Sequence, residues 1–255
     1  MKSSTFEEIC EETFAEIFNR AKNTDEKKFL TNCFAFHNKW NHNILTYYLD
    51  DEFREVLELI SDLIDVKESE NINKTTKARM YLLIYTHIIE VDLIYLILYN
   101  MINTIRKKEY SPYVKYLNKK NEETEAIYPS QKIKCLQDIG HEINIDIESL
   151  YNKFFDSNLR NAFSHSQYYL YPSGDLENTK NISTTFSTTS KSKKVQSMYT
   201  YEDIECKFEM SLDYVRSFIK IYKKSIKPYM DGNSHETLYG PIEFDSEHEW
   251  RFTQK

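Results

Sequence analysis

The longest apolar segment of the chain, residues 77–108, limits the fold more than any other feature of the sequence. It reads KARMYLLIYTHIIEVDLIYLILYNMINTIRKK. A segment of this length that is apolar nearly all round either crosses a membrane or forms the central helix of a bundle. His87, Glu90 and Asp92 fall in its middle, and a carboxylate inside hydrocarbon is costly. We therefore predict no membrane span and a helical bundle built around this segment.

The scarcity of glycine and proline supports the same fold. The 255 residues include four glycines and five prolines. Sandwiches and barrels need many tight turns, which these two residues favour, so their scarcity indicates long helices and few hairpins. Hydrophobic residues make up 40% of the chain, which excludes a disordered chain and provides a core. We predict an all-α fold, a helical bundle with one small β-hairpin.

Apolar side chains that recur every three or four residues mark the expected helices. These helices cover residues 6–22, a stretch that starts near 25, and residues 44–64, 77–108, 133–140, 147–164 and 201–225. Ser4 or Thr5 can cap the first helix, and Thr200 with Asp203 resembles a capping box at the start of the last. Gly140 is expected to end the helix before it.

The segments between these helices are polar or contain turn-forming residues. Residues 34–43 are expected to bend, residues 67–76 to form a loop, and residues 109–131 to form an irregular connection with one short helix. The run YYLYPSGDLEN (168–178) is typical of a β-hairpin that follows the helix 147–164. Residues 178–194 are rich in Ser, Thr and Lys and predict a flexible loop or a mobile arm of the hairpin.

Three segments follow one another in the predicted organisation. Residues 1–75 form N-terminal helices, either as a separate module or as part of the main domain. Residues 76–228 form the bundle, with the hairpin and loop at 168–199. Pro228 ends the last helix, and residues 229–255 form an extended tail.

Charge and cysteine content narrow the classes of partner. The net charge of −7 argues against a broad basic surface that coats nucleic acid, although a local basic patch remains open. The four cysteines form no CxxC pair and no secretory segment opens the chain, which predicts reduced thiols and a cytoplasmic protein. The seven histidines lack zinc-ligand spacing, so we predict no metal and no cofactor.

One polar cluster interrupts the apolar pattern, in the run LRNAFSHSQYYL (159–170). On a helix its apolar residues form one stripe, which leaves Arg160, Asn161, Ser164 and His165 on the other side. Asn161 and His165 are four residues apart and share a face. Arg160 and His165 lie about 140° apart on an ideal helix. They converge only if the helix unwinds before His165, or if a second copy of the chain supplies the opposing half.

Arginine, asparagine and histidine together suit metal-free cleavage of RNA. The 2′-hydroxyl must lose a proton to attack phosphorus, and the departing 5′-oxygen must gain one. An imidazole transfers protons near neutral pH, so His165 fits this role. The Arg160 guanidinium stays charged and its fork matches two phosphate oxygens. Asn161 can orient the imidazole or the phosphate, and a helix C-terminus beside His165 favours the protonated ring.

The stretch RNAFSH, followed by aromatic residues and a predicted hairpin, resembles the signature of the HEPN superfamily of helical domains. In that signature an arginine, often followed by a polar residue, precedes a histidine with four to six residues between them. Arg160 matches the arginine, Asn161 the polar residue and His165 the histidine, with four residues between. The resemblance covers about residues 78–225.

The resemblance implies a function and partners. Many HEPN proteins are metal-independent ribonucleases of toxin–antitoxin, abortive-infection or CRISPR-associated systems, and they dimerise so that two Arg/His pairs meet in one cleft. It implies that Arg160, Asn161 and His165 are catalytic, that RNA is the substrate, and that a second copy and an antitoxin or defence partner bind. One branch of the family has a modifiable Tyr two residues after the His. Gln167 stands there, and Tyr168 comes one residue later.

Several alternatives remain open at the level of residues. His165 can be a structural histidine at a helix end, Asn161 a packing group, and Ser164 a serine bonded back to its own helix. Glu90 belongs either to a helix-surface strip at the dimer face or a local polar network, or to an ion pair that holds the Arg160 guanidinium in place.

Three functional hypotheses follow from the sequence. The first is a metal-independent endoribonuclease of the HEPN type. The second is a non-catalytic member that binds RNA or acts as a protein adaptor and keeps the motif for binding. The third is a purely structural interaction domain, which would retain no RNA even at low salt.

Overall fold

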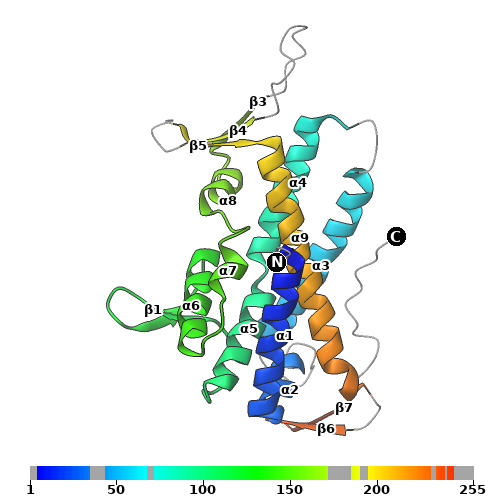
Figure 1. Ribbon diagram of the computed structural model, residues 1–255, viewed down its shortest axis with the longest axis vertical. Helices are drawn as coiled ribbons and strands as arrows, with labels where there is room; N and C mark the ends of the chain where they lie inside the picture. Colours follow the sequence, from blue (N-terminus) through cyan, green and yellow to red (C-terminus); the bar gives the residue numbers. More distant parts are fainter. Residues whose placement is uncertain are drawn as a thin grey trace. The chain divides into compact units, whose positions relative to one another are not determined.

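The structure of the protein is a computed structural model that describes residues 5–34, 44–67, 72–171, 185–189, 195–230, 234–238 and 240–243. Helices make up most of the described chain, and its strands are short (Figure 1). The mostly helical fold is therefore confirmed, and so is a small antiparallel sheet directly after the motif helix. The bend predicted at 34–43 lies outside the described residues except for its first position.

The chain divides into two compact units, and both are discontinuous in sequence. Unit 1 contains Met1–Glu55, Val91–Tyr151 and Asp213–Lys255, and unit 2 contains Val56–Glu90 and Asn152–Leu212. Their limits differ from the segment boundaries expected near residues 75 and 228. The predicted boundaries of the N-terminal helices, the bundle and the tail stay a prediction.

Unit 1 is mainly helical. Its helices are α1 (Phe6–Thr24), α2 (Glu26–Phe34), the first part of α3 (Ile44–Lys67), α5 (Asp92–Ile105), α6 (Pro129–Glu142), α7 (Glu148–Tyr151) and the second part of α9 (Tyr201–Ile226). The predicted cap of α1 is confirmed, because Thr5 and Glu8 exchange side-chain and backbone hydrogen bonds in a capping box. α1, α2 and α6 pack on α5, whose twelve residues from Leu93 to Thr104 are all buried. α5 is thus the central helix of this unit.

Aromatic side chains fill the core of unit 1. Phe14 and Phe218 meet edge to face with ring centroids 5.7 Å apart. The hydroxyl groups of the buried Tyr151 and Tyr214 share a hydrogen bond of 2.7 Å. Burial raises the pKa of both tyrosines, so both stay neutral and this bond persists at neutral pH.

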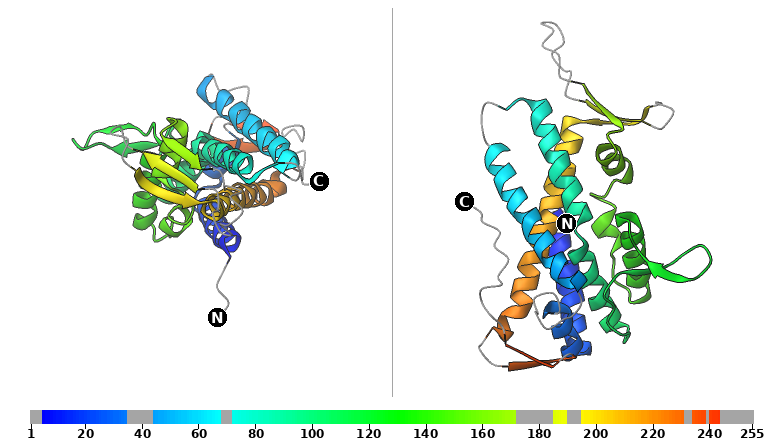
Figure 2. Two further views of the ribbon diagram at one scale, coloured as in Figure 1. Left: turned by 90° about the horizontal axis from the view of Figure 1, so that it is seen from above. Right: turned by 180° about the vertical axis from the view of Figure 1, so that it is seen from behind.

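Two short hairpins complete unit 1. Strands β1 (Lys115–Leu117) and β2 (Glu123–Glu125) pair antiparallel and project beside α6 (Figure 2). The prediction of a short helix within 109–131 is therefore wrong, because this segment contains a β-hairpin. After α9, the turn η1 (Lys227–Tyr229) contains Pro228, and β6 (Ser234–Thr237) pairs with β7 (Gly240–Glu243).

Gly140 does not end its helix, contrary to the prediction. α6 continues through it to Glu142. A Cβ at Gly140 would lie 2.5 Å from Cγ1 of Ile147. The glycine is therefore required for the close approach of Ile147 to α6, and not for a left-handed turn.

Unit 2 contains the motif. Its helices are the end of α3, α4 (Lys74–Glu90), α8 (Ser157–Ser164) and the first part of α9. α4 packs against α8, and Tyr81 of α4 stacks on Phe208 of α9 with centroids 4.4 Å apart. The capping box predicted at Thr200 and Asp203 is confirmed at the start of α9.

The sheet of unit 2 has one more strand than predicted. Its order is β3 (Tyr168–Tyr171), β4 (Thr185–Thr189) and β5 (Val195–Thr200), all antiparallel. β4 lies inside the segment 178–194 that was expected to be a loop or a mobile arm. The Pro-Ser-Gly-Asp turn that was expected after Tyr171 lies outside the described residues.

The long apolar segment is not one helix. α4 ends at Glu90 and α5 begins at Asp92, because Val91 leaves the helical conformation with ψ 107°. By length and composition Lys74–Ile105 could cross a membrane, but 78% of its most apolar window is buried inside the protein. This burial is typical of a core segment in a soluble protein, in agreement with the prediction.

The predicted helix 147–164 is also broken. α7 ends at Tyr151 and α8 starts at Ser157. Asp156 takes an extended conformation and caps α8, while the carbonyl of Phe154 accepts a hydrogen bond from the buried Tyr85 hydroxyl. Tertiary partners therefore hold these residues outside the helix, although the apolar spacing runs through them.

Candidate active site

The helix that carries the motif, α8, begins at Asp156. The Asp156 carboxylate accepts hydrogen bonds from the backbone N–H of Asn158 at 2.9 Å and of Leu159 at 3.1 Å. These bonds satisfy two of the four N–H groups that a helix start leaves without partners. Leu159 and Ala162 are buried, so the opposite side of this two-turn helix presents the polar residues.

Two tyrosines fix Asp156 from other elements of unit 2. Tyr199 of β5 donates its hydroxyl to the carboxylate at 2.9 Å, and the hydroxyl of Tyr85 of α4 accepts the backbone N–H of Asp156 at 2.8 Å. Burial, and then the hydrogen bond to Asp156, raise the pKa of Tyr199 to about 12. Tyr199 therefore keeps its proton at neutral pH and anchors the start of α8 to the sheet.

The other end of α8 places His165 at the surface. The N–H of Gln167 bonds the carbonyl of Ala162 at 2.7 Å, and the N–H of Ser166 bonds that of Phe163 at 3.1 Å. This is a Schellman turn with Ser166 in the left-handed region, at φ 53°. His165 is the exposed C-cap residue, so the predicted position of the imidazole at a helix C-terminus is correct.

The Arg160 guanidinium is held by two side chains. Its Nε and Nη2 atoms pair with the Glu90 carboxylate at the end of α4, and its Nη1 atom donates to Oδ1 of Asn161 at 2.7 Å. The Arg160 side chain is 16% exposed and that of Glu90 is 40% exposed. Of the two alternatives for Glu90, the ion pair with Arg160 is the one present.

The structure brings together some of the predicted residues and not others. Arg160, Asn161 and Glu90 form one cluster. Among the described residues, no hydrogen bond or ion pair joins the His165 imidazole to this cluster, and Asn161 contacts Arg160 instead of the histidine. α8 remains helical through Ser164, so it does not unwind to bring Arg160 and His165 together within one copy.

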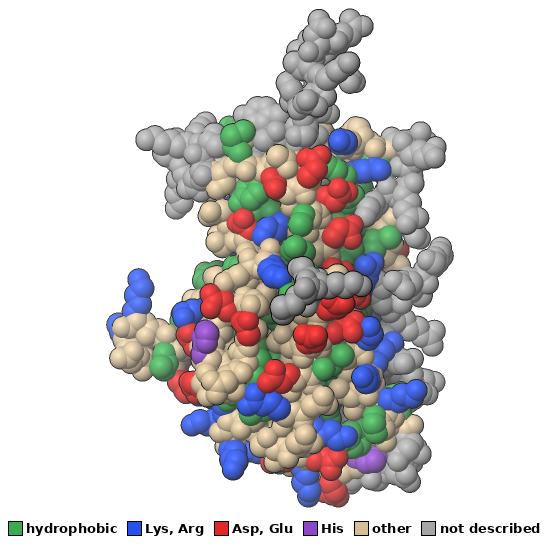
Figure 3. All heavy atoms as spheres, in the orientation of Figure 1, with side chains coloured by type: hydrophobic (Ala, Val, Ile, Leu, Met, Phe, Trp, Pro, Cys, Tyr) green, Lys and Arg blue, Asp and Glu red, His purple; other side chains and the backbone are tan. Residues whose placement is uncertain are grey.

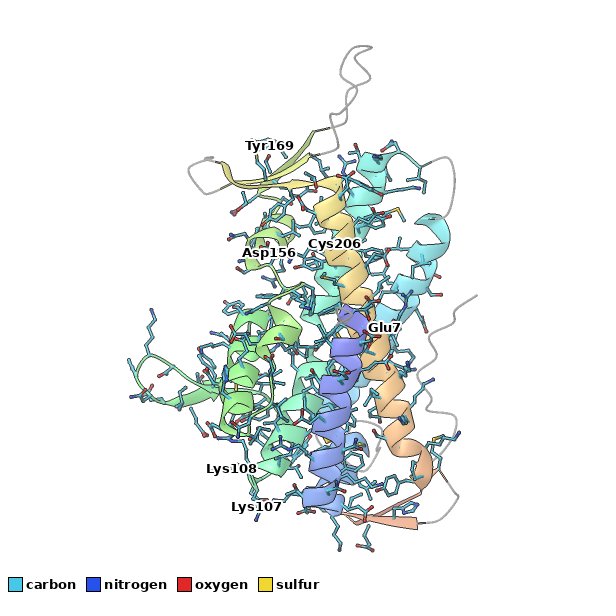
Figure 4. The ribbon with its side chains drawn as sticks, in the orientation of Figure 1. Glu7, Lys107, Lys108, Asp156, Tyr169 and Cys206 are labelled. Carbon is cyan, nitrogen blue, oxygen red and sulfur yellow. The ribbon has the colours of Figure 1, made fainter. Side chains whose placement is uncertain are left out.

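The aromatic residues after the motif belong to the sheet. The ring of Tyr168 stacks on Phe163 with centroids 5.5 Å apart, which supports the interpretation of Tyr168 as a strand residue. Tyr169 is exposed on the same strand (Figure 4). Within the described part of the chain, no three His, Cys, Asp or Glu side chains are grouped to hold a metal ion.

Sequence reasoning missed Asp156, Tyr199 and Tyr85. Asp156 had a local signal, because an aspartate directly before the first helical residue is a common N-cap. The two tyrosines had none, since Tyr85 and Tyr199 lie 71 and 43 residues away from Asp156 along the chain.

The chain matches no family model, no curated protein and no solved structure. One short helix carries a half-buried guanidinium with a fixed orientation and ends at an exposed imidazole. A guanidinium is a group type that can bind phosphate, and an imidazole is one that can transfer a proton.

Proposed function

We propose that the protein is a metal-independent endoribonuclease of the HEPN type. It would act in the cytoplasm, in bacterial defence against phage or in a toxin–antitoxin system. The single observation that supports this most is the state of Arg160. Glu90 and Asn161 fix the guanidinium without sealing it from solvent, and the same two-turn helix ends at an exposed His165. The resemblance of RNAFSH to the family signature is the second support.

In the proposed reaction the 2′-hydroxyl of the RNA loses its proton and attacks the adjacent phosphorus. The bond to the 5′-oxygen breaks, and that oxygen gains a proton. The products are a 2′,3′-cyclic phosphate and a 5′-hydroxyl. His165 transfers the proton, and Arg160 stabilises the negative charge that develops on the non-bridging phosphate oxygens, with the N–H groups that Glu90 and Asn161 leave unused.

Two copies of the chain complete the proposed site. The two residues lie on different sides of α8, which stays helical between them. A two-fold axis beside α8 would place the Arg160 of one copy opposite the His165 of the other. We propose such a homodimer with a composite active site.

A second candidate is a non-catalytic RNA-binding or adaptor protein, and one contact favours it. The Glu90 carboxylate neutralises much of the Arg160 charge, which weakens the attraction of a phosphate. In this case the motif would order α8 and α4 rather than perform chemistry.

Cleavage of RNA in EDTA by the purified protein distinguishes the two. We expect cleavage that EDTA does not abolish, with 2′,3′-cyclic phosphate termini, and its loss in His165→Ala by a factor of about 100 to 10,000. His141→Ala is the matched control, because His141 is an exposed histidine of α6 in unit 1. A folded His165→Ala protein with the wild-type rate would disprove the assignment of the reaction to His165 and the HEPN motif, and RNA that is bound but uncut by the wild-type protein would support the second candidate.

A further inference from the structure

A cavity of about 210 Å³ lies within unit 1, between α1, α2 and the end of α9. Its walls include the buried Phe18, Phe29 and Ile221. Two lysines, Lys22 and Lys224, also line it. The cavity therefore combines an apolar wall with positive charge.

No acidic side chain among the described residues that line this cavity neutralises its two lysines. Neither aspartate nor glutamate lines it, and among the described residues neither Lys22 nor Lys224 takes part in an ion pair. Lys220, one turn before Lys224 on α9, pairs with Glu11. Lysine and arginine side chains gather over the lower half of α9 (Figure 3). Lys22 and Lys224 thus differ from Lys220, whose charge Glu11 neutralises.

Nearby groups keep Lys22 at the cavity. Its Nζ atom lies 4.8 Å from the centroid of the Tyr229 ring, a cation–π contact that holds the ammonium without neutralising it. The hydroxyl of Tyr229 in turn donates to Glu26. The Glu26 carboxylate is therefore engaged by the tyrosine rather than by Lys22.

We propose that this cavity binds a small organic anion, with a phosphate or carboxylate between Lys22 and Lys224 and a flat apolar body against the accessible Ala15 and Pro228. The volume equals that of roughly seven water molecules, which suits one ring with one anionic group and is too small for a macromolecule. Asn19 and Ser225 also line the cavity and supply hydrogen-bonding groups. The site shares no residue with the candidate active site and does not depend on the proposed nuclease.

Calorimetric titration of the full-length protein with phenyl phosphate tests this proposal, with inorganic phosphate and phenol as separate arms. We expect saturable binding of phenyl phosphate that is tighter than that of either fragment and that weakens as salt is added. Lys22→Gln and Lys224→Gln should each weaken it by about tenfold, since each removes one charged hydrogen bond. Lys220→Gln is the control on the same helix and should leave it unchanged.

Ala15→Leu gives an independent measurement, because Ala15 also lines the cavity and a larger side chain there reduces its volume. Melting curves confirm that each variant is folded. Weaker binding in Ala15→Leu, together with the two lysine effects, supports the site. The proposal is overturned by the absence of saturable binding, by equal losses in all three lysine variants, or by a fragment that binds as tightly as phenyl phosphate.

Discussion

The two carboxylates on either side of Val91 each pair with a cation. The two ion pairs differ in how exposed the cation is and in how many of its N–H groups remain free to bind another group. Glu90 pairs with Arg160 in unit 2, and Asp92 pairs with Lys132 in unit 1. The Lys132 side chain is 7% exposed, and that of Arg160 is 16% exposed.

The chemistry of the cations explains why one pair is structural and the other a candidate site. Lys132 carries a compact ammonium that lies 6.0 Å from the Tyr95 ring and joins α6 to α5. Arg160 carries a planar fork of five N–H groups, which two acceptors orient but do not saturate. An acid beside a helix break thus joins two helices in one unit and, in the other, orients a guanidinium that we propose binds phosphate.

The largest expected difference between the two pairs is in RNA cleavage. Arg160→Lys keeps the charge but loses the fork, so we expect the single-turnover rate to fall by about 100 to 1,000-fold. Lys132→Arg should leave the rate unchanged, since that cation touches no reacting group. Equal losses in the two variants would remove the distinction between the pairs.

The Lys132 pair should matter for the stability of the fold rather than for RNA cleavage. Lys132→Ala removes a buried side chain and leaves Asp92 without its cation, and we expect the free energy of unfolding in urea to fall by about 1–3 kcal/mol. The control is Lys134→Ala, which breaks an exposed pair with Asp138 and should cost less than about 1 kcal/mol. Equal costs would show that Lys132 is not structural.

The cap of α8 is expected to have a moderate effect. Asp156→Ala removes the bonds to Asn158, Leu159 and Tyr199, so we expect a loss of about 1–2 kcal/mol in unfolding free energy and slower cleavage. Asp156→Asn should retain most of the stability, because asparagine caps a helix about as well. A variant pair with indistinguishable stabilities would show that the cap does not position the motif.

A smaller effect is expected at high pH. The pKa of Tyr199 is raised to about 12, first by burial and then by Asp156. The neutral hydroxyl therefore stabilises the fold fully below the usual tyrosine pKa of about 10, and this contribution is lost as the pH rises through 12. We expect Tyr199→Phe to be less stable than wild type in urea at pH 8, and the difference to shrink above pH 10. A difference that is constant with pH would contradict this role.

The smallest expected change is a gain. Ser166 has φ 53°, a left-handed conformation that favours glycine. Ser166→Gly should raise the free energy of unfolding by about 0.5 kcal/mol and leave cleavage unchanged. Destabilisation in this variant would show that the serine side chain contributes something beyond the turn.

Local signals predicted much of the fold. The capping residues Thr5 and Thr200 mark their helices because each signal lies within three residues of the helix start. The breaks at Val91 and at 152–156 were missed because the apolar spacing continues through them. The hairpin β1–β2 was missed because strands of three residues are too short to show alternation.

The site was predictable only in part, for a similar reason. Arg160, Asn161 and His165 lie within six residues, so their pattern is visible in the sequence. The contact of Arg160 with Glu90 remained an open alternative because 70 residues separate them. Which face of a helix meets which distant element depends on tertiary packing, and a single sequence does not contain that information in local form.

Mixing two inactive variants tests the central claim most directly. If the Arg160 of one copy and the His165 of its partner share a phosphodiester, Arg160→Ala and His165→Ala should complement each other. Random exchange would give about half heterodimers with one intact site each, hence about one quarter of the wild-type rate. If the wild-type protein cleaves RNA and the mixture stays inactive after exchange, the site is not shared between copies and the account is wrong.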